Sequence, residues 1–148
     1  AAYEKYGGPC VVVDMGTAIT LDVITADGRY LGGSIAPGIR IAQDGLFGKT
    51  AKLPKIELKQ PSTAIAESTS DAINSGIVIG YIGMIDKLID TIEDEMVKRL
   101  GVKKSDINVI ATGGFSELIS QSSEYINTIE PDLMLEGLRI IYERNHSR

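Results

Sequence analysis

The sequence is poor in several residue types, and each shortage excludes a class of protein. It has one cysteine, one histidine and no tryptophan in 148 residues, so an internal disulfide and a metal site built from paired cysteines are excluded. Basic residues number 15 against 20 acidic residues, which gives a net charge of −5. A nucleic-acid surface needs a basic stripe, so we expect no nucleic-acid partner.

Long apolar runs are also missing. The longest, residues 77–85, is far shorter than the roughly 20 residues of a membrane-spanning helix, so we expect no membrane partner. A single cysteine is typical of a reducing compartment, which predicts a cytoplasmic protein. Hydrophobic residues make up 43% of the chain and charged residues 24%, so residues 1–148 are expected to form one ordinary domain.

The most informative segment is Asp14-x-Gly16-Thr17, which joins two β-branched runs at residues 10–13 and 18–24. Two such runs with a short glycine-containing turn between them predict a β-hairpin. At its tip, Gly16 lets a ligand approach the backbone, Thr17 and the turn amides offer donors, and Asp14 offers oxygens for a cation. This combination predicts a site that handles phosphoryl groups. Aspartate and glycine also occur in turns for conformational reasons alone, so a turn without function stays open.

Turn residues and hydrophobic periodicity predict the remaining elements in the order β-β-β-α-α-β-α-β-α, which is an α/β fold that opens with a three-strand meander. The expected strands are residues 10–13, 18–24, 29–36, 108–111 and 125–127, and the expected helices are 39–46, 69–100, one from about 115, and 131–141. Residues 1–6 are typical of the last turns of a helix that ends at Gly7. We therefore expect further residues upstream.

The long helix has a distinctive beginning. Ser68 and Asp71 are spaced as an N-terminal capping pair. The following half is apolar on all sides, which predicts burial on both sides of the helix. Gly76, Gly80 and Gly83 share one face of it, where a second backbone can pack closely.

Two further positions are candidates for ligand contacts. Thr112, Gly113 and Gly114 follow a predicted buried strand and precede a helix, at the sheet edge where α/β proteins bind ligands. A base or ribose can lie on such a backbone, although these residues taken alone favour a tight strand-to-helix turn without a ligand. Thr69 lies at the start of the long helix, where it either contacts a ligand or only caps the helix.

The motifs taken together are more specific than any one of them. In order they are Asp14-x-Gly16-Thr17, Gly32-Gly33-x-Ile35-x-Pro37-Gly38, Lys52-Leu53-Pro54, Ser68-Thr69, Gly80-x-x-Gly83-x-x-Asp86, Thr112-Gly113-Gly114 and Asp132-Leu133-x-Leu135-x-Gly137-Leu138. In this order and spacing the chain resembles the C-terminal half of a type III pantothenate kinase. That family belongs to the superfamily of acetate and sugar kinases, heat-shock chaperone ATPases and actin. The resemblance implies a ribonuclease-H-like, actin-like ATPase domain.

The resemblance also implies a role for each matching residue. Asp14 matches the ligand of a monovalent cation, potassium or ammonium, and Gly16 and Thr17 match the second phosphate motif for ATP. Residues 112–114 match the adenosine motif, and Thr69 matches a threonine that contacts pantothenate. ATP is expected to arrive with a divalent cation, magnesium.

Two elements of the family are missing from this sequence. The first phosphate motif, Asp-x-Gly-Asn-Thr, and the Gly-x-Asp-Arg motif with the general base belong to the N-terminal half, so no catalytic residue is expected within residues 1–148. The resemblance therefore implies two partners, the N-terminal half of the kinase and a second copy in a homodimer. It implies ATP-dependent phosphorylation of pantothenate, the first step of coenzyme A biosynthesis. The alternative is a non-catalytic nucleotide-binding or regulatory module of the same superfamily.

Overall fold

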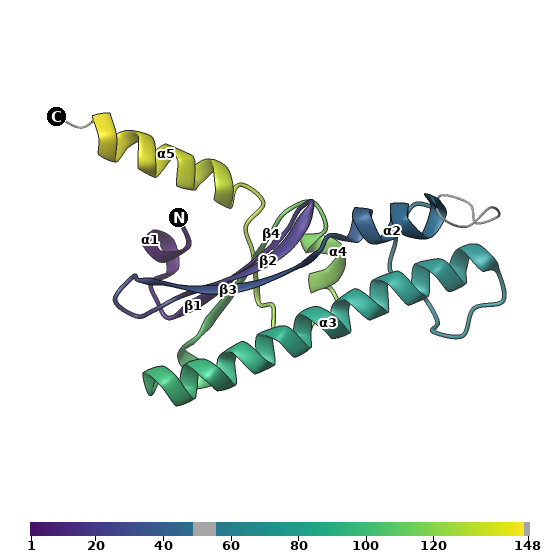
Figure 1. Ribbon diagram of the computed structural model, residues 1–148, viewed down its shortest axis with the longest axis horizontal. Helices are drawn as coiled ribbons and strands as arrows, with labels where there is room; N and C mark the ends of the chain where they lie inside the picture. Colours follow the sequence, from purple (N-terminus) through teal and green to yellow (C-terminus); the bar gives the residue numbers. More distant parts are fainter. Residues whose placement is uncertain (49–55, 147–148) are drawn as a thin grey trace.

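The computed structural model describes residues 1–48 and 56–146, which form a mixed α/β fold around one five-stranded sheet (Figure 1). The strands are β1 (Cys10–Met15), β2 (Ala18–Ile24), β3 (Tyr30–Pro37), β4 (Asn108–Thr112) and β5 (Thr128–Ile129). The helices are α1 (Ala2–Tyr6), α2 (Ile39–Gly48), α3 (Thr69–Leu100), α4 (Ser116–Ser120) and α5 (Leu133–His146), with a short 3-10 turn, η1 (Lys104–Asp106).

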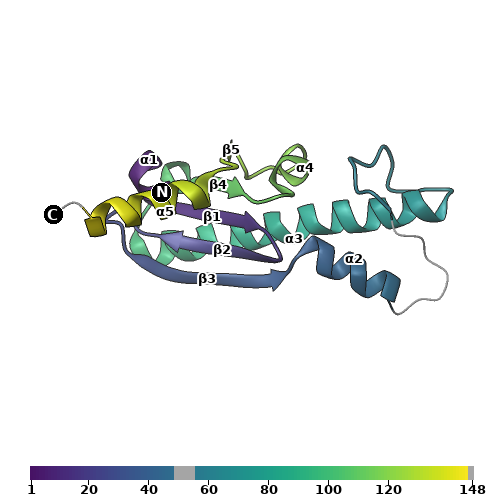
Figure 2. The same cartoon turned by 90° about the horizontal axis from the view of Figure 1, so that it is seen from above.

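The strands lie in the order β3-β2-β1-β4-β5. Strands β1, β2 and β3 form the predicted antiparallel meander, and β4 and β5 add parallel strands beside β1. Helix α3 runs under one face of the sheet, and α1 and α5 lie on the other (Figures 1 and 2). The end of the β1–β2 hairpin therefore lies beside the end of β4.

Alternation along β1 sets the two faces. Val11, Val13 and Met15 are at most 1% exposed and pack with α3, whereas Val12 and Asp14 face away from it and are half-buried. A strand places successive side chains on opposite faces, so Asp14 leaves the core at the end of β1. The strand thus carries an acidic group to the hairpin tip without burying it under α3.

Helix α3 begins and ends where the sequence predicts. The Ser68 side chain accepts a hydrogen bond from the Asp71 amide at 3.1 Å, and Gly101 ends the helix with φ 69°. Ile85 and Ile89 are fully buried against the sheet. By length and apolar composition alone α3 would also pass as a membrane-crossing helix, a test that core helices of soluble proteins pass as well.

The prediction that the first half of α3 is buried on both sides is wrong for the chain as described. Gly76, Gly80 and Gly83 are exposed, Ile79 is 44% exposed, and an added Cβ at any of the three glycines would meet nothing within 4 Å. The sheet covers only one side of the helix. The opposite side is a smooth face of small residues.

Two boundaries near the C-terminus also differ from the prediction. The fifth strand is two residues long and follows residues 125–127, because the Ser123 hydroxyl accepts hydrogen bonds from the Tyr125 and Ile126 amides and holds them in a turn. The last helix continues past residue 141 to His146, whose ring stacks on Tyr142 with 4.1 Å between centroids.

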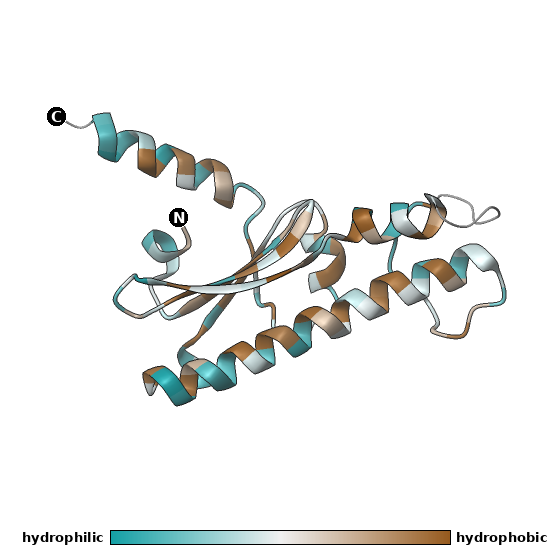
Figure 3. Ribbon diagram, in the orientation of Figure 1, coloured by the Kyte–Doolittle hydropathy of each residue, from teal (hydrophilic) through white to brown (hydrophobic). Residues whose placement is uncertain are grey.

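Helix α5 is amphipathic with an uncovered apolar side (Figure 3), formed by Met134, Leu135, Leu138, Ile141 and Tyr142. The motif at residues 52–54 lies outside the described residues.

Candidate active-site wall

The predicted phosphate turn is the tip of the β1–β2 hairpin. Gly16 and Thr17 are both exposed between Met15 and Ala18, the ends of the two strands. The Gly16 amide donates to the Ala18 carbonyl at 3.1 Å, so the prediction that the turn amides are exposed is wrong for Gly16. An added Cβ there would lie 3.5 Å from the Asp14 carboxylate, an ordinary contact. The fold therefore does not require glycine at position 16, and a ligand has open access to its backbone.

The start of α2 is fastened to this tip. The Gly38 amide donates to the Thr17 carbonyl at 3.1 Å, and an added Cβ at Gly38 would lie 2.0 Å from that oxygen. The Tyr81 hydroxyl of α3 donates to the carbonyls of Pro37 and Gly38 at 3.0 and 3.2 Å. Because backbone contacts made by glycine are short and specific, the first turn of α2 is held in a fixed position beside Thr17.

Asp14 lies between the two glycine turns of the predicted site. Its Oδ1 would be 3.5 Å from a Cβ at Gly16 and 2.8 Å from one at Gly113. Burial raises the pKa of the Asp14 carboxyl, and the negative charge of Asp22 raises it further. Asp22 itself accepts hydrogen bonds from the Thr20 and Tyr30 hydroxyls at 2.9 Å.

This donor set fits a weakly held cation better than a tightly held one. A positive charge beside Asp14 would offset the repulsion from Asp22, and carboxylate, backbone carbonyl and water oxygens are the ligands that hard cations take. Among the described residues no group of three histidine, cysteine or carboxylate side chains could hold a metal ion. The residues present therefore fit one carboxylate with carbonyls and water.

The turn after β4 packs against the hairpin. Parallel pairing places Thr112 beside Asp14, and Gly113 adopts φ +92° with no room for a side chain, since a Cβ would lie 2.7 Å from the Met15 carbonyl. The Ser116 hydroxyl and amide both donate to the Gly113 carbonyl, at 2.7 and 3.1 Å. An added Cβ at Gly114, by contrast, would meet nothing within 4 Å. Gly113 is thus required by packing, whereas Gly114 is open.

The predicted residues line two hollows rather than one. Gly16, Thr17 and Gly114 line a hollow of about 370 Å³ together with the first turn of α2. Asp14 and Thr112 line another of about 390 Å³, on the sheet face that carries α1 and α5. The β1 strand contributes to both, because Asp14 and Met15 point to opposite faces. A ligand that contacts both hollows at the hairpin tip would have to extend from one face of β1 to the other.

Thr69 lies apart from these residues. It is exposed at the first turn of α3, where Ser68 performs the capping. Tyr81, which contacts the base of α2 beside the tip, lies 12 residues further along the same helix, and at 1.5 Å per residue this is roughly 18 Å. The structure therefore does not bring Thr69 into the hollow that contains Thr17.

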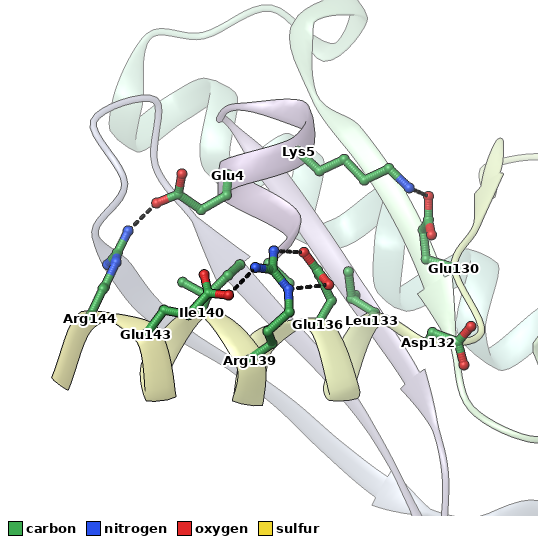
Figure 4. A pocket seen from close by; sticks show the side chains of 11 residues that line it. Glu4, Lys5, Glu130, Asp132, Leu133, Glu136, Arg139, Ile140, Glu143 and Arg144 are labelled. Atoms are coloured by element: carbon green, nitrogen blue, oxygen red, sulfur yellow. Dashed lines mark hydrogen bonds and ion pairs between the residues drawn. The ribbon is translucent and has the colours of Figure 1, made fainter. Parts of the chain in front are cut away.

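A hollow of about 760 Å³ between α1 and α5 contains none of the predicted residues. Most of its charged side chains pair with one another (Figure 4): Lys5 with Glu130, Arg144 with Glu4, and Arg139 with Glu136 and Glu143. Hydrogen bonds from Lys5 and Tyr6 lower the pKa of Glu130. The described lining carries five acidic side chains against three basic ones. This excess of negative charge does not favour a polyphosphate, so we do not assign the groove to the phosphoryl chemistry.

Sequence reasoning missed two residues of the hollow at the hairpin tip. Arg40, in the first turn of α2, and Phe115, after Gly114, both line it, and the guanidinium carbon lies 5.7 Å from the ring centroid. Neither belongs to a motif with a characteristic spacing. The signals available in the sequence were the position of Phe115 directly after Gly114 and that of Arg40 two residues after Gly38.

Comparison with known proteins gives a consistent result. A family model described as type III pantothenate kinase matches residues 1–91. Type III pantothenate kinases from Koribacter versatilis, Finegoldia magna and Roseiflexus sp. are 46%, 49% and 47% identical over 98–99% of this chain. The chain spans about half the length of these relatives, 51–55%.

A solved structure supports the fold. The crystal structure of a Campylobacter jejuni protein described as a Baf family transcriptional activator is similar over 99% of this chain and 62% of its own, with a TM-score of 0.64. At 23% identity this similarity supports the arrangement of the elements and nothing about activity.

Proposed function

Because this chain belongs to the type III pantothenate kinase family, we propose that it forms one wall of an active site that phosphorylates pantothenate with ATP. The reaction moves the γ-phosphoryl group to the primary hydroxyl of pantothenate and begins coenzyme A biosynthesis. The observation that carries the proposal is the junction of two turns at one sheet edge: Asp14 lies beside Gly16 of the hairpin tip and beside Gly113 after β4. Phosphoryl transfer depends mostly on positioning and charge neutralisation. This junction offers positioning, and a cation held at Asp14 would supply positive charge.

We assign the residues as follows. Thr17 donates to the phosphates of ATP, Gly16 and Gly114 let the nucleotide lie close to the backbone, and Gly113 and Thr112 shape the adenosine side. Asp14 holds potassium or ammonium, and magnesium arrives with ATP. When bound, these cations offset the phosphate charge. Thr69 contacts pantothenate.

The rest of the active site belongs to the other half of the kinase. The general base and the first phosphate motif are placed there, because neither pattern occurs in this sequence. We propose that the other half packs on the exposed apolar side of α5, where Leu135 and Leu138 are 65% and 59% exposed. In this proposal each half is a ribonuclease-H-like domain, and a cytoplasmic enzyme closes its cleft between them.

An activity assay tests the proposal. The full-length protein should convert pantothenate and ATP to phosphopantothenate and ADP, detected by mass spectrometry. Residues 1–148 alone should show no turnover, and adding the separately expressed upstream half should restore it. Turnover by residues 1–148 alone would contradict the assignment to one wall. A full-length protein that binds nucleotide without phosphorylating pantothenate would favour the alternative of a regulatory module.

We also propose a homodimer that uses the small-residue face of α3. Gly76, Ile79, Gly80 and Gly83 leave this face smooth and uncovered, and a smooth face lets a second helix approach closely. Replacing Gly80 with glutamate should convert the dimer to a monomer in size-exclusion chromatography with light scattering. Glutamate is a better helix former than glycine by about 0.5–0.8 kcal/mol, so unfolding of α3 would not explain the loss of the dimer.

The matched control is Gly45→Glu, at an exposed helical glycine of α2 whose Cβ position is equally open. This variant should keep the dimer. A wild-type protein that is monomeric at the concentrations of the assay, or a dimer that persists in Gly80→Glu, would refute the proposed interface.

A further inference from the structure

Among the described residues that line the hollow beside the hairpin tip, one is basic, Arg40, and one is acidic, Asp44. Its lining residues are Met15, Gly16, Thr17, Arg40, Ile41, Asp44, Gly114 and Phe115. A protein with a net charge of −5 does not attract a triphosphate by its overall field, so local positive charge has to serve. Arg40 is the residue in the hollow that can provide it.

Arg40 is held in place from two sides. It comes two residues after Gly38, whose amide is bonded to the Thr17 carbonyl. Its guanidinium lies over the ring of Phe115, at 5.7 Å from the centroid. Phe115 in turn follows Gly114, in the turn that Ser116 fixes to the Gly113 carbonyl. The guanidinium therefore bridges the predicted phosphate turn and the predicted adenosine turn.

This geometry leaves the donors of the guanidinium free. The contact with the Phe115 ring uses no N–H donor of the guanidinium in a hydrogen bond, and a guanidinium can bind phosphate oxygens with pairs of such donors. No ion pair between Arg40 and a described carboxylate exists. An exposed arginine that is oriented by a ring, beside an open threonine and an open glycine, is arranged for an anion.

We propose that Arg40 binds the polyphosphate of the nucleotide and that Phe115 positions it. This inference rests on the proposed function, since it assigns a further contact at the same site. It specifies the ligand class as a nucleoside di- or triphosphate, recognised through its phosphates. In this proposal the base of the nucleotide is bound by the backbone of the turn after β4.

The test measures binding of MgATP, MgADP and adenosine to the full-length protein by calorimetry, together with steady-state kinetics. Arg40→Ala should weaken MgATP binding about 10- to 100-fold, the range expected for losing hydrogen bonds to a charged group. Adenosine affinity and the KM for pantothenate should stay within about twofold. Arg40→Lys should restore part of the loss, because lysine keeps the charge without the planar pair of donors.

The role of Phe115 is tested by two variants. Phe115→Leu should weaken MgATP binding with the same nucleotide pattern as Arg40→Ala, while Phe115→Tyr, which keeps an aromatic face, should bind as the wild type does. The control is Arg99→Ala, at an exposed arginine that pairs with Glu95 on α3, and it should leave all three affinities unchanged.

The outcomes separate the two proposals. A wild-type protein that fails to bind MgATP would overturn the proposed function itself. If the wild type binds MgATP and Arg40→Ala binds it equally well, only the assignment of Arg40 fails. An equal loss for adenosine and MgATP in Arg40→Ala would also overturn that assignment, because it would place the guanidinium on the base.

Discussion

Replacing Gly113 with alanine should destabilise the protein by about 2–4 kcal/mol, the combined range for a strained backbone and an overpacked core position. Two independent features predict this. Gly113 adopts φ +92°, which costs energy for any residue with a Cβ, and that Cβ would lie 2.7 Å from the Met15 carbonyl and 2.8 Å from Asp14 Oδ1. The clashing atoms belong mainly to the backbone of β1, which cannot move without disturbing the sheet.

Gly114→Ala is the matched control. Its Cβ would meet nothing within 4 Å and its φ is not positive, so the free energy of unfolding should stay within about 1 kcal/mol of the wild type. Urea denaturation of both variants, followed by circular dichroism, measures the difference. Equal stability of the two variants would show that the turn after β4 does not pack against the hairpin tip as described. MgATP binding should fall in Gly114→Ala even though its stability does not, if the nucleotide lies on this backbone.

These two glycines show what the sequence can and cannot predict about the site. Both stand in the same Thr-Gly-Gly motif, and composition alone gives them equal roles. Gly113 packs against β1, a strand about 100 residues earlier in the sequence, whereas nothing lies within 4 Å of an added Cβ at Gly114. Only the three-dimensional register of β1 beside β4 separates them, because the distinction depends on which backbone atoms lie opposite each Cα.

The fold was predictable to a large extent because its signals are local. The hairpin, the meander and the capped helix at Ser68 each depend on residues within a few positions of one another. The prediction for the fifth strand was wrong because Tyr125 and Ile126 are β-formers, yet the Ser123 hydroxyl accepts from both their amides and holds them in a turn. Asp86 in turn accepts a hydrogen bond from the Ser123 hydroxyl. The prediction that the small-residue face of α3 is covered within this chain was wrong for a related reason: apolar composition shows that a face can be covered, but it does not show which element or partner covers it.

Removing the charge of Asp14 should have the largest effect on cation dependence. In the full-length protein, Asp14→Asn should abolish potassium stimulation of the kinase, since the carboxylate is the one charged ligand that we assign. Outer-shell changes at metal sites already cost about 10- to 100-fold in affinity, so a larger loss is expected for a direct ligand. Potassium should raise the melting temperature of the wild-type protein and leave that of the variant unchanged.

The same variant should be more stable than the wild type when no cation is bound. Burial and the charge of Asp22 raise the pKa of Asp14 in the folded state, so the folded protein binds this proton more tightly than the unfolded chain does. Stability attributable to Asp14 therefore falls as the pH rises from the ordinary carboxyl range, about pH 4, through the raised pKa. At pH 7 the wild type carries an unfavourable charge that asparagine lacks.

Chemical denaturation in sodium-free and potassium-free buffer, from pH 3 to pH 7, measures this difference. The variant should exceed the wild type at pH 7, and the two curves should converge below about pH 4, where the carboxyl is protonated in both states. Asp106→Asn, at an exposed aspartate of η1 before the start of β4, controls for the general loss of one negative charge, because Asp14 lies beside Thr112 at the opposite end of that strand. A destabilised Asp14→Asn variant at pH 7 would mean that Asp14 supports the hairpin tip structurally, and potassium stimulation that survives in a folded variant would place the cation elsewhere.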